Sequence, residues 1–460
     1  MSIDLGFETI GNATCTVYDG SNPILTTDPW VIGKPYFGSW THRYKIPEDK
    51  KSNIFNAKYV WISHGHPDHL DIESLNNFKN AYILISDHYN NRIYNDLLDL
   101  NYNVKIIKSN VDYQLSKNIS IKCYADHYQD SIIIINIADK DLIVNLNDSN
   151  LFGIKEVIKK EINRHNRCKN KFLLKAIGLY DADMVNFYDS NDNFILEEHL
   201  TVNNKTGKTW SDSMRELGCN YGIIFSSMHK YQRSDSVHLN KYTKPLKTHW
   251  HLFDNTIGEL LPPFIIWDSI KNDYTMIDPD ETNSQIIPSE YYGDSWSDTL
   301  DNNDKKLLLD YFNKLETIKP YIGIIHFNCG GDLYSIEISK IKNEIIFEVP
   351  RNSLMKAIRF SIFDDLLIGN FMRTRLINLD SLYPIFAPLV TKYYDNGMIN
   401  TFEDLKNYHK YYKSISGSDY LYYKDVAKRR LKDAYKGSSL ELFYYYSSRV
   451  YYHIFNKNIT

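Results

Sequence analysis

The sequence predicts an α/β fold built from one large and one smaller domain, and three observations support this prediction. Short segments rich in β-branched and aromatic residues alternate with amphipathic segments, which is the rhythm of strands and helices in α/β proteins. The chain has 460 residues, of which 43% are hydrophobic, enough for a large buried core. Four potential metal ligands lie together where one apolar segment ends. We therefore place a large domain at residues 1–250 and a smaller α+β domain with a helical tail at residues 251–460.

Composition limits the classes of function. The net charge is −4, with acidic and basic residues interspersed, which does not indicate binding to nucleic acid or to a membrane surface. The N-terminus lacks a basic region followed by an apolar core, and the longest aliphatic run, residues 132–135, is too short to cross a bilayer. The five cysteines contain no C-x-x-C pair and do not predict disulfides or structural zinc. We expect a cytoplasmic protein that acts on a small molecule.

The predicted strands of the first domain are short and bounded by polar turns. They cover residues 7–27 as two hairpin strands, 57–63, 82–86, 104–108, 119–127, 132–137, 142–146 and 222–229. Helices are predicted between them at residues 71–75 and near 91–98. The alternation predicts a sheet whose faces are covered by helices.

The potential metal ligands are His64, His66, Asp68 and His69, in the loop between the strand at 57–63 and the next helix. Two imidazoles two positions apart on an extended backbone can bind one cation, and the carboxylate and third imidazole can turn toward a second. Two neighbouring metals can share one water or oxygen species. A histidine-rich surface loop without function would suit a single histidine better than this ordered set.

This motif resembles the signature of the metallo-β-lactamase superfamily, whose fold is a four-layer αββα sandwich that holds one or two metals between its sheet edges. The resemblance implies three more ligands downstream, each just after a strand. His127 would complete the first metal's set with His64 and His66, and His229 would join Asp68 and His69 on the second metal. A hydrogen-bonded surface histidine is the alternative for His127.

Asp148 is the candidate for the bridging ligand, because a carboxylate has two oxygens that can touch both cations. Asp126, Asp130 and Asp141 compete for this role, and Asp148 is preferred because it follows a wholly apolar strand. We expect Asp68 and Asp148 to be the catalytic carboxylates.

Three further residues are candidates for supporting roles. In the superfamily an aspartate ends the strand behind the metals, and Asp28 matches it; its expected role is to accept a hydrogen bond and fix an imidazole tautomer. An ordinary Asp-Pro turn is the alternative. Tyr231 and Arg233 follow His229 at the expected pocket mouth, where Arg233 could pair with an anionic group of the substrate. An ion pair between Arg233 and Asp235 is an equally good interpretation.

The C-terminal part begins where prolines interrupt the pattern, between residues 244 and 263. Residues 335–339 and 344–349 are predicted as hairpin strands, and 353–362 and 402–413 as helices. Residues 365–376 are similar to the CMP-N-acetylneuraminate hydroxylase family. The same resemblance covers residues 28–33, 61–78 and 145–148. The Rieske iron–sulfur domain of that family needs Cys-x-His and Cys-x-x-His pairs, and this chain has no cysteine with a histidine two positions on.

Two functions are compatible with these ligands. In the first, two irons activate dioxygen to hydroxylate a small polar, anionic substrate, and a separate protein such as a ferredoxin or Rieske protein supplies the electrons. In the second, zinc activates a water that attacks an ester, lactone or phosphodiester. Imidazole and carboxylate ligands suit both metals. We favour the oxygenase because the C-terminal resemblance accompanies the hydroxylase family.

Overall fold

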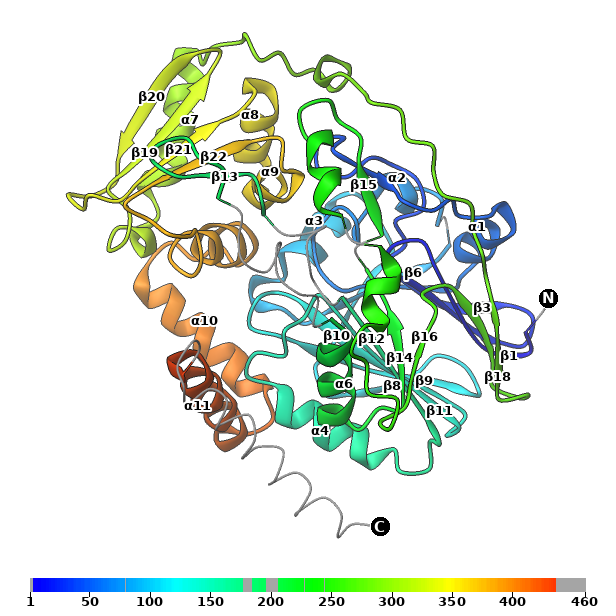
Figure 1. Cartoon of the computed structure of the whole chain (residues 1–460). Helices are drawn as coiled ribbons and strands as arrows, with labels where there is room; N and C mark the ends of the chain where they lie inside the picture. Colours follow the sequence, from blue (N-terminus) through cyan, green and yellow to red (C-terminus); the bar gives the residue numbers. More distant parts are fainter. Residues whose placement is uncertain are drawn as a thin grey trace.

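The computed structural model describes residues 3–78, 80–176, 184–195, 206–226, 228–243 and 245–435. Two large β-sheets face each other at its centre, helices cover their outer faces, and a third sheet with its own helices lies to one side (Figure 1). This arrangement confirms the predicted αββα sandwich with a smaller α+β part.

The first large sheet has eight strands in the order β18-β17-β1-β2-β3-β5-β6-β7. They are β1 (Leu5–Ile10), β2 (Thr14–Asp19), β3 (Pro23–Thr27), β5 (Tyr59–Ile62), β6 (Tyr82–Ser86), β7 (Val104–Ile107), β17 (Ile265–Asp268) and β18 (Asp273–Met276). Helices α1 (Glu48–Phe55), α2 (Ile72–Leu75) and α3 (Arg92–Asp99) belong to this half. The strands from β3 to β7 are parallel, so the metal motif after β5 lies at the carboxyl edge of the sheet.

The second large sheet has seven strands in the order β16-β14-β12-β11-β10-β9-β8. They are β8 (Asp112–Gln114), β9 (Ile119–Ala125), β10 (Ser131–Ile137), β11 (Asp141–Asn147), β12 (Asn170–Lys175), β14 (Tyr221–Ile224) and β16 (Glu259–Leu261). Helices α4 (Lys155–Arg164) and α6 (Thr206–Leu217) cover its outer face (Figure 1).

The core between the sheets is fully buried and includes Phe7, Trp61 and Phe172. In β10, Ile133 and Ile135 join this inter-sheet core, while the alternate residues Ile132 and Ile134 pack in the cluster that includes the covering helices. Both faces of the strand are therefore buried, which explains its continuous aliphatic run.

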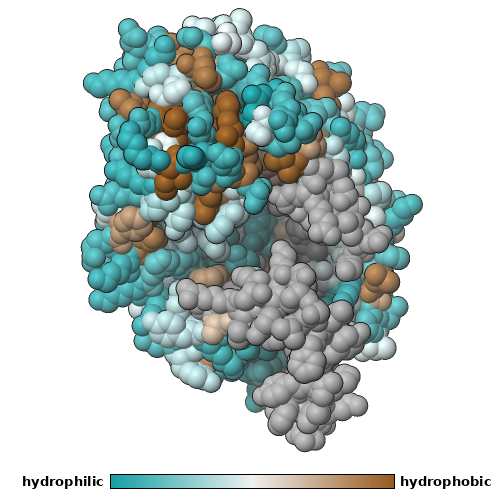
Figure 2. Space-filling model, turned by 60° about the vertical axis from the view of Figure 1, so that its left-hand side comes forward, coloured by the Kyte–Doolittle hydropathy of each residue, from teal (hydrophilic) through white to brown (hydrophobic). Residues whose placement is uncertain are grey.

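The third sheet has the order β13-β22-β21-β19-β20. Its strands are β13 (Phe187–Tyr188), β19 (Ile324–Cys329), β20 (Asp332–Glu337), β21 (Glu344–Glu348) and β22 (Arg373–Ile377). One face packs on α7 (Asn302–Asn313), α8 (Arg351–Phe360) and α9 (Phe363–Gly369) in a separate apolar cluster. Exposed apolar residues of this part include Tyr321, Leu333 and Ile341, and Figure 2 shows apolar side chains gathered on the upper part of the molecule. Along β19, β21 and β22 buried residues alternate with half-buried ones, so one face of the sheet is accessible to solvent.

The chain continues into a π-helix, η6 (Pro388–Asn396), and then α10 (Phe402–Ile415) and α11 (Asp419–Tyr435), of which α11 contacts α4. A two-stranded ribbon joins β4 (Trp40–His42) to β15 (His229–Tyr231). The short 3-10 helices are η1 (Tyr89–Asn91), η2 (Val237–Tyr242), η3 (Leu246–Trp250), η4 (Ser289–Tyr292) and η5 (Glu316–Ile318).

Three details differ from the sequence predictions. Residues 7–27 form three strands, because the chain makes an extra turn at Gly11, whose φ of +73° favours glycine. Strands β20 and β21 do not pair as a hairpin, because β19 lies between them. The predicted boundary at residue 250 does not separate the sheets. Strands β16, β17 and β18 follow this residue but belong to the large sheets, and β13 precedes it but belongs to the third sheet.

Among the helices of the described residues, none combines the length and the apolar character needed to span a membrane.

Candidate metal centre

The motif loop is fixed at both ends by its own hydrogen bonds. At the end of β5, the Ser63 amide donates to Asp28 Oδ1 (2.7 Å). The amides of His69 and Leu70 both donate to the carbonyl of His66 (2.9 and 2.8 Å), which makes a tight turn. The side chain of Asp71 then caps α2 by accepting from the Ser74 amide (3.0 Å). The ligand side chains therefore leave a rigid backbone.

The first pair of ligand nitrogens is His64 Nε2 and His66 Nδ1, which lie 2.8 Å apart. Their outer nitrogens have partners: His64 Nδ1 is 2.8 Å from Ser63 Oγ, and His66 Nε2 is 2.8 Å from Asp364 Oδ2. Burial would raise the pKa of Asp364, but Lys392 and His66 outweigh it and hold that pKa below its ordinary value. Because Asp364 is then an acceptor, His66 Nε2 carries the proton and Nδ1 presents a lone pair inward.

The second group combines His69 with two carboxylates. His69 Nε2 lies 3.1 Å from Asp68 Oδ2 and 3.4 Å from Asp148 Oδ2. Its outer nitrogen, Nδ1, lies 3.3 Å from Asp28 Oδ2, the position that the sequence prediction gave to Asp28. Asn147 also donates to Asp28. Asn147 Nδ2 lies 3.0 Å from His69 Nδ1, so Asp28 and Asn147 together orient the ring with Nε2 facing the carboxylates.

The carboxylate of Asp68 is oriented by two donors. Asn12 Nδ2 donates to Oδ2 (2.8 Å), and the Tyr36 hydroxyl donates to Oδ1 (2.5 Å). Both donors are buried. Neither was identified from the sequence, because nothing in the residues around Asn12 or Tyr36 marks them as neighbours of the motif.

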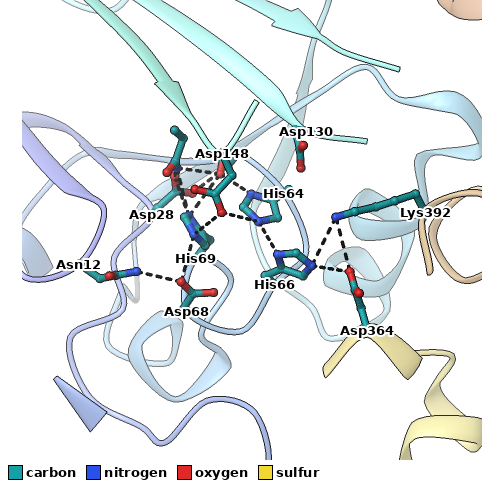
Figure 3. Close-up of polar contacts among 12 residues, drawn as sticks. Asn12, Asp28, His64, His66, Asp68, His69, Asp130, Asp148, Asp364 and Lys392 are labelled. Atoms are coloured by element: carbon teal, nitrogen blue, oxygen red, sulfur yellow. Dashed lines mark hydrogen bonds and ion pairs between the residues drawn. The ribbon is translucent and has the colours of Figure 1, made fainter. Parts of the chain in front are cut away.

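Asp148 connects the two groups, as Figure 3 shows. Its Oδ2 lies 3.7 Å from His64 Nε2 and 3.4 Å from His69 Nε2. His64, His69 and Asp148 offer ligand atoms within 4.8 Å of one another, a group that could hold a metal ion. The Asp148 side chain is 27% exposed, against 3% for His64 and 0% for His69. The centre is therefore reached from the side of Asp148.

The electrostatics of this group fit a bound cation. Burial would lower the pKa of His69, but Asp68 and Asp148 outweigh it and raise that pKa well above its ordinary value. Burial would raise the pKa of Asp68, but the neighbouring His69 outweighs it and holds that pKa below its ordinary value. The two carboxylates beside His69 Nε2 thus favour a positive charge at this nitrogen. A divalent metal ion at this place would replace the proton, so the donor set fits metal binding.

Asp130 faces the same centre, although the sequence suggested it only as an alternative bridging ligand. It is buried, and its Oδ1 accepts no hydrogen bond from the described residues. Burial raises its pKa to about 6; Lys392 opposes this shift and Asp148 adds to it. Figure 3 shows Asp130 on the side of His64 away from Asp68. It lies beside the centre but outside the group of ligand atoms that fall within 4.8 Å of one another.

His127 is not brought to the ligand group. Its ring stacks on His409 of α10 with centroids 4.5 Å apart and is hydrogen-bonded to it, and its Nδ1 is 3.4 Å from the Tyr393 hydroxyl. Burial lowers the pKa of His127 to about 3. The reason is the turn after β9, where Asp126 accepts from the amides of residues 128 and 130. This turn directs His127 toward α10 and Asp130 toward the metal motif.

His229 is connected to Asp68 through two aromatic rings. Its buried ring stacks on Trp40 with centroids 3.3 Å apart, and Trp40 packs on Tyr36 at 4.4 Å. Tyr36 in turn donates to Asp68. The role of His229 as a ligand stays a prediction.

Arg233 and Tyr231 are buried among other protein residues and do not lie at a pocket mouth. The Arg233 side chain has no exposed surface; it pairs with Asp235 (2.8 Å) and Asp294 (2.7 Å) and stacks on Phe371 (3.9 Å). Tyr231 is also buried, and its hydroxyl accepts from Asn370 (2.9 Å). The geometry favours the ion pair with Asp235 over substrate binding. A polar sequence segment alone does not distinguish a solvated loop from a buried ion pair.

Comparison with known proteins gives one short sequence match and several distant structural ones. No protein-family model matches the chain. Cytidine monophosphate-N-acetylneuraminic acid hydroxylase of Asterias rubens is 36% identical over 52 residues, which is 11% of this chain and 8% of that protein. The chain thus matches only a small part of that relative's length.

The structural matches cover about half of this chain at low identity. CmlA, a diiron beta-hydroxylase from Streptomyces venezuelae, is 10% identical, with 59% of this chain and 54% of that chain covered and a TM-score of 0.37. An isothiocyanate hydrolase from Delia radicum gut bacteria is 12% identical, with 59% and 98% covered and a TM-score of 0.35. A flavodiiron protein from Giardia intestinalis is 13% identical, with 46% and 61% covered and a TM-score of 0.23.

Two features of the chain carry its resemblance to a known superfamily. They are the αββα sandwich and the His-x-His-x-Asp-His loop at the edge of its sheet. In fold and in ligand motif, the chain resembles the metallo-β-lactamase superfamily.

Proposed function

We propose that the chain is a dinuclear metalloenzyme that uses two irons and dioxygen to hydroxylate a small polar substrate. One observation carries the proposal: a single carboxylate oxygen, Asp148 Oδ2, lies 3.7 Å from His64 Nε2 and 3.4 Å from His69 Nε2. Two ligand groups that meet at one carboxylate suit two neighbouring cations better than one.

The first metal would be held by His64, His66 and Asp130, and the second by Asp68, His69 and the predicted ligand His229, with Asp148 shared. Asp130 takes the place proposed from the sequence for His127, because it faces the centre and His127 does not. With Asp148 shared, the first metal would have two imidazole and two carboxylate ligands, a nitrogen and oxygen set that supports iron.

Bound irons would supply the activation of dioxygen. Hydroxylation then inserts one oxygen atom into a C–H bond and releases the other as water, which needs two protons from solvent and two electrons from a separate donor such as a ferredoxin or Rieske protein. The chain's own residues prepare the site: Asp28 and Asp364 fix the imidazoles, while Asn12 and Tyr36 orient Asp68. His64, Asp68 and His69 are buried, while His66 is partly exposed and Asp148 more so, which limits the access of water to the centre.

The short match to the hydroxylase supports this choice of reaction. Because Arg233 is buried, it gives no support for an anionic substrate, and the proposal is limited to a small polar one. The alternative is a zinc hydrolase of an ester, lactone or phosphodiester. The imidazole nitrogens of the centre suit zinc as well as iron and therefore support this alternative too.

Elemental analysis of protein purified without oxygen from cells supplied with iron and zinc tests the proposal. We expect about two irons per chain, and dioxygen consumption when a ferredoxin and reductase are added. Retention of zinc together with hydrolysis of test phosphodiesters or lactones would favour the alternative. Protein that retains neither metal would contradict both.

A further inference from the structure

The two parts of the molecule meet at the metal motif through one histidine. His66 Nε2 donates to Asp364 Oδ2 at 2.8 Å, and the two residues are 298 positions apart in the sequence. His66 belongs to the motif loop, whereas Asp364 lies in the first turn of α9, beside the third sheet. The C-terminal part therefore contacts a proposed metal ligand directly.

Asp364 is itself held by a buried cation. Lys392 Nζ lies 3.5 Å from Asp364 Oδ2 and 3.4 Å from His66 Nε2, as Figure 3 shows. An ammonium group can only donate, and His66 Nε2 uses its own proton toward Asp364, so Lys392 is attracted by the carboxylate of Asp364, as it is by that of Asp130. The Lys392 side chain is 13% exposed and that of Asp364 is 7% exposed. Water therefore screens this ion pair weakly.

Lys392 lies in the π-helix η6. This helix is hydrogen-bonded to α9, the helix that carries Asp364. The Phe363 amide at the start of α9 donates to Asp395 Oδ2 (2.8 Å), and the Tyr311 hydroxyl donates to Asp395 Oδ1 (2.6 Å). Asp395 lies three positions after Lys392 in η6. The backbones that carry Asp364 and Lys392 therefore form one unit, and π-helices in proteins are frequently found at functional sites.

We propose that Asp364 is a positioning residue of the metal centre, and that Lys392 acts through it. Asp364 fixes His66 with Nε2 protonated and Nδ1 turned to the metal, while Lys392 holds the carboxylate in place. This role rests on the proposed metal site but not on the choice between hydroxylation and hydrolysis. Carboxylates that bind the outer nitrogen of a metal-bound histidine typically contribute 10–100-fold to metal affinity.

The test is titration of the metal-free full chain with Co²⁺, read by its visible spectrum and by competition with a chelator. Asp364→Asn is expected to weaken the binding of one of two Co²⁺ ions by about 10–100-fold and to shift its ligand-field bands, because the His66 ring loses its charged partner. The matched control is Asp310→Asn, an exposed aspartate of α7 in the same part of the molecule. Its affinity and spectrum are expected to equal those of the wild type.

A double-mutant cycle tests the role of Lys392. Lys392→Met keeps the aliphatic stem and removes the charge, and we expect it to weaken the same Co²⁺ site. In the Asp364→Asn background, the effect of Lys392→Met should be clearly smaller than in the wild type, because one of its two carboxylate partners is already neutral and only Asp130 remains. Additive effects would contradict the claim that Lys392 acts through Asp364.

The outcomes separate this inference from the proposed function. Wild-type protein that binds no Co²⁺ would contradict the metal site and, with it, the role of Asp364. Wild-type protein that binds Co²⁺, together with an Asp364→Asn variant of unchanged affinity and spectrum, would contradict the role of Asp364 alone. If Asp364→Asn does not fold, judged by circular dichroism, an unchanged Lys392→Met variant would overturn the proposal for the pair.

Discussion

Asp148 is the most exposed of the residues that the geometry brings together at the motif, and it is also the one that both groups share. We expect Asp148→Ala to lose both metals while the fold is kept, because the change removes the shared oxygen and opens no buried cavity. Elemental analysis and circular dichroism measure the two effects. Asp139→Ala, in the exposed turn between β10 and β11, is the control. Two metals retained in Asp148→Ala would show that another residue joins the groups.

Asp395 makes stability depend on pH. Burial raises its pKa to about 7, although the bonds from Tyr311 and the Phe363 amide oppose the shift. In the unfolded chain an aspartate has a pKa of about 3.9. Between these values the native state holds a proton that the unfolded state has released, so stability falls as pH rises through this window.

Asp395→Asn should remove this dependence. From pH 5 to pH 8, metal-free wild-type protein is expected to lose about 2 kcal/mol more unfolding free energy than the variant. Urea unfolding of both proteins at the two pH values measures the difference, in which the contributions of other groups cancel. An equal loss in both proteins would show that Asp395 is ionised throughout this range.

The residues of the motif could be predicted from the sequence because three histidines and one aspartate at this spacing are typical of metal ligands. Asp28 and Asp148 also lie next to His69 of the motif. His127 shows the limit of such reasoning: it stands at the expected strand end, yet one turn stabilised by Asp126 sends its ring to α10 and Asp130 to the centre. Side-chain direction in a tight turn depends on hydrogen bonds that a spacing pattern does not contain.

The ribbon of β4 and β15 is anchored by Arg233, which follows β15 and binds two carboxylates without any exposed surface. Arg233→Met should destabilise the fold by about 3–5 kcal/mol, because Asp235 and Asp294 lose a buried counter-charge. Lys230→Met, in the same ribbon, should cost about 0–1 kcal/mol, since its pair with Glu281 is partly exposed. Thermal unfolding compares the two. Equal melting temperatures would mean that the Arg233 cluster adds nothing to the fold.

Most single elements were predicted because each contains its own signals, such as the apolar run of β10 or the helical period of α10. Pairing between strands was harder to predict. The predicted hairpin of β20 and β21 is interrupted by β19, which pairs with β20 in an antiparallel and with β21 in a parallel manner. Which strands become neighbours depends on how the whole sheet buries its face, and local periodicity does not encode that choice.

Arg92 in α3 connects the two parts of the molecule. Its guanidinium donates to the carbonyls of Ser361 (2.7 Å), Asp395 (2.6 Å) and Phe360 (2.6 Å), which flank α9 and belong to η6. Arg92→Met should cost about 2–4 kcal/mol, because these carbonyls lose a charged donor. It should also speed amide hydrogen exchange in α9 and η6.

Hydrogen exchange read by mass spectrometry tests this expectation on the metal-free protein. Arg359→Met is the control, because Arg359 lies in the same part but is about half exposed and makes only a 3.8 Å ion pair with Asp304. Unchanged exchange in α9 and η6 of Arg92→Met would mean that other contacts hold the two parts together.

The four-layer sandwich was predictable for the molecule as a whole, because strand and helix periods and the motif agree. The exchange of strands across residue 250 was not, since prolines mark where the chain turns and not which sheet it joins. Asp364 and Lys392 also gave no signal of their own. They stand far from the motif in the sequence, and only the packing of α9 and η6 brings them to His66.

The separation of His66 from Asp364 has a consequence in time. A ribosome adds about 5–20 residues per second, so roughly 15–60 s pass between the synthesis of the histidine and that of its partner, 298 positions later. During this interval the outer nitrogen of His66 lacks the carboxylate that fixes the ring in the finished chain. The orientation of this proposed ligand is therefore completed only when the C-terminal part has folded against the motif.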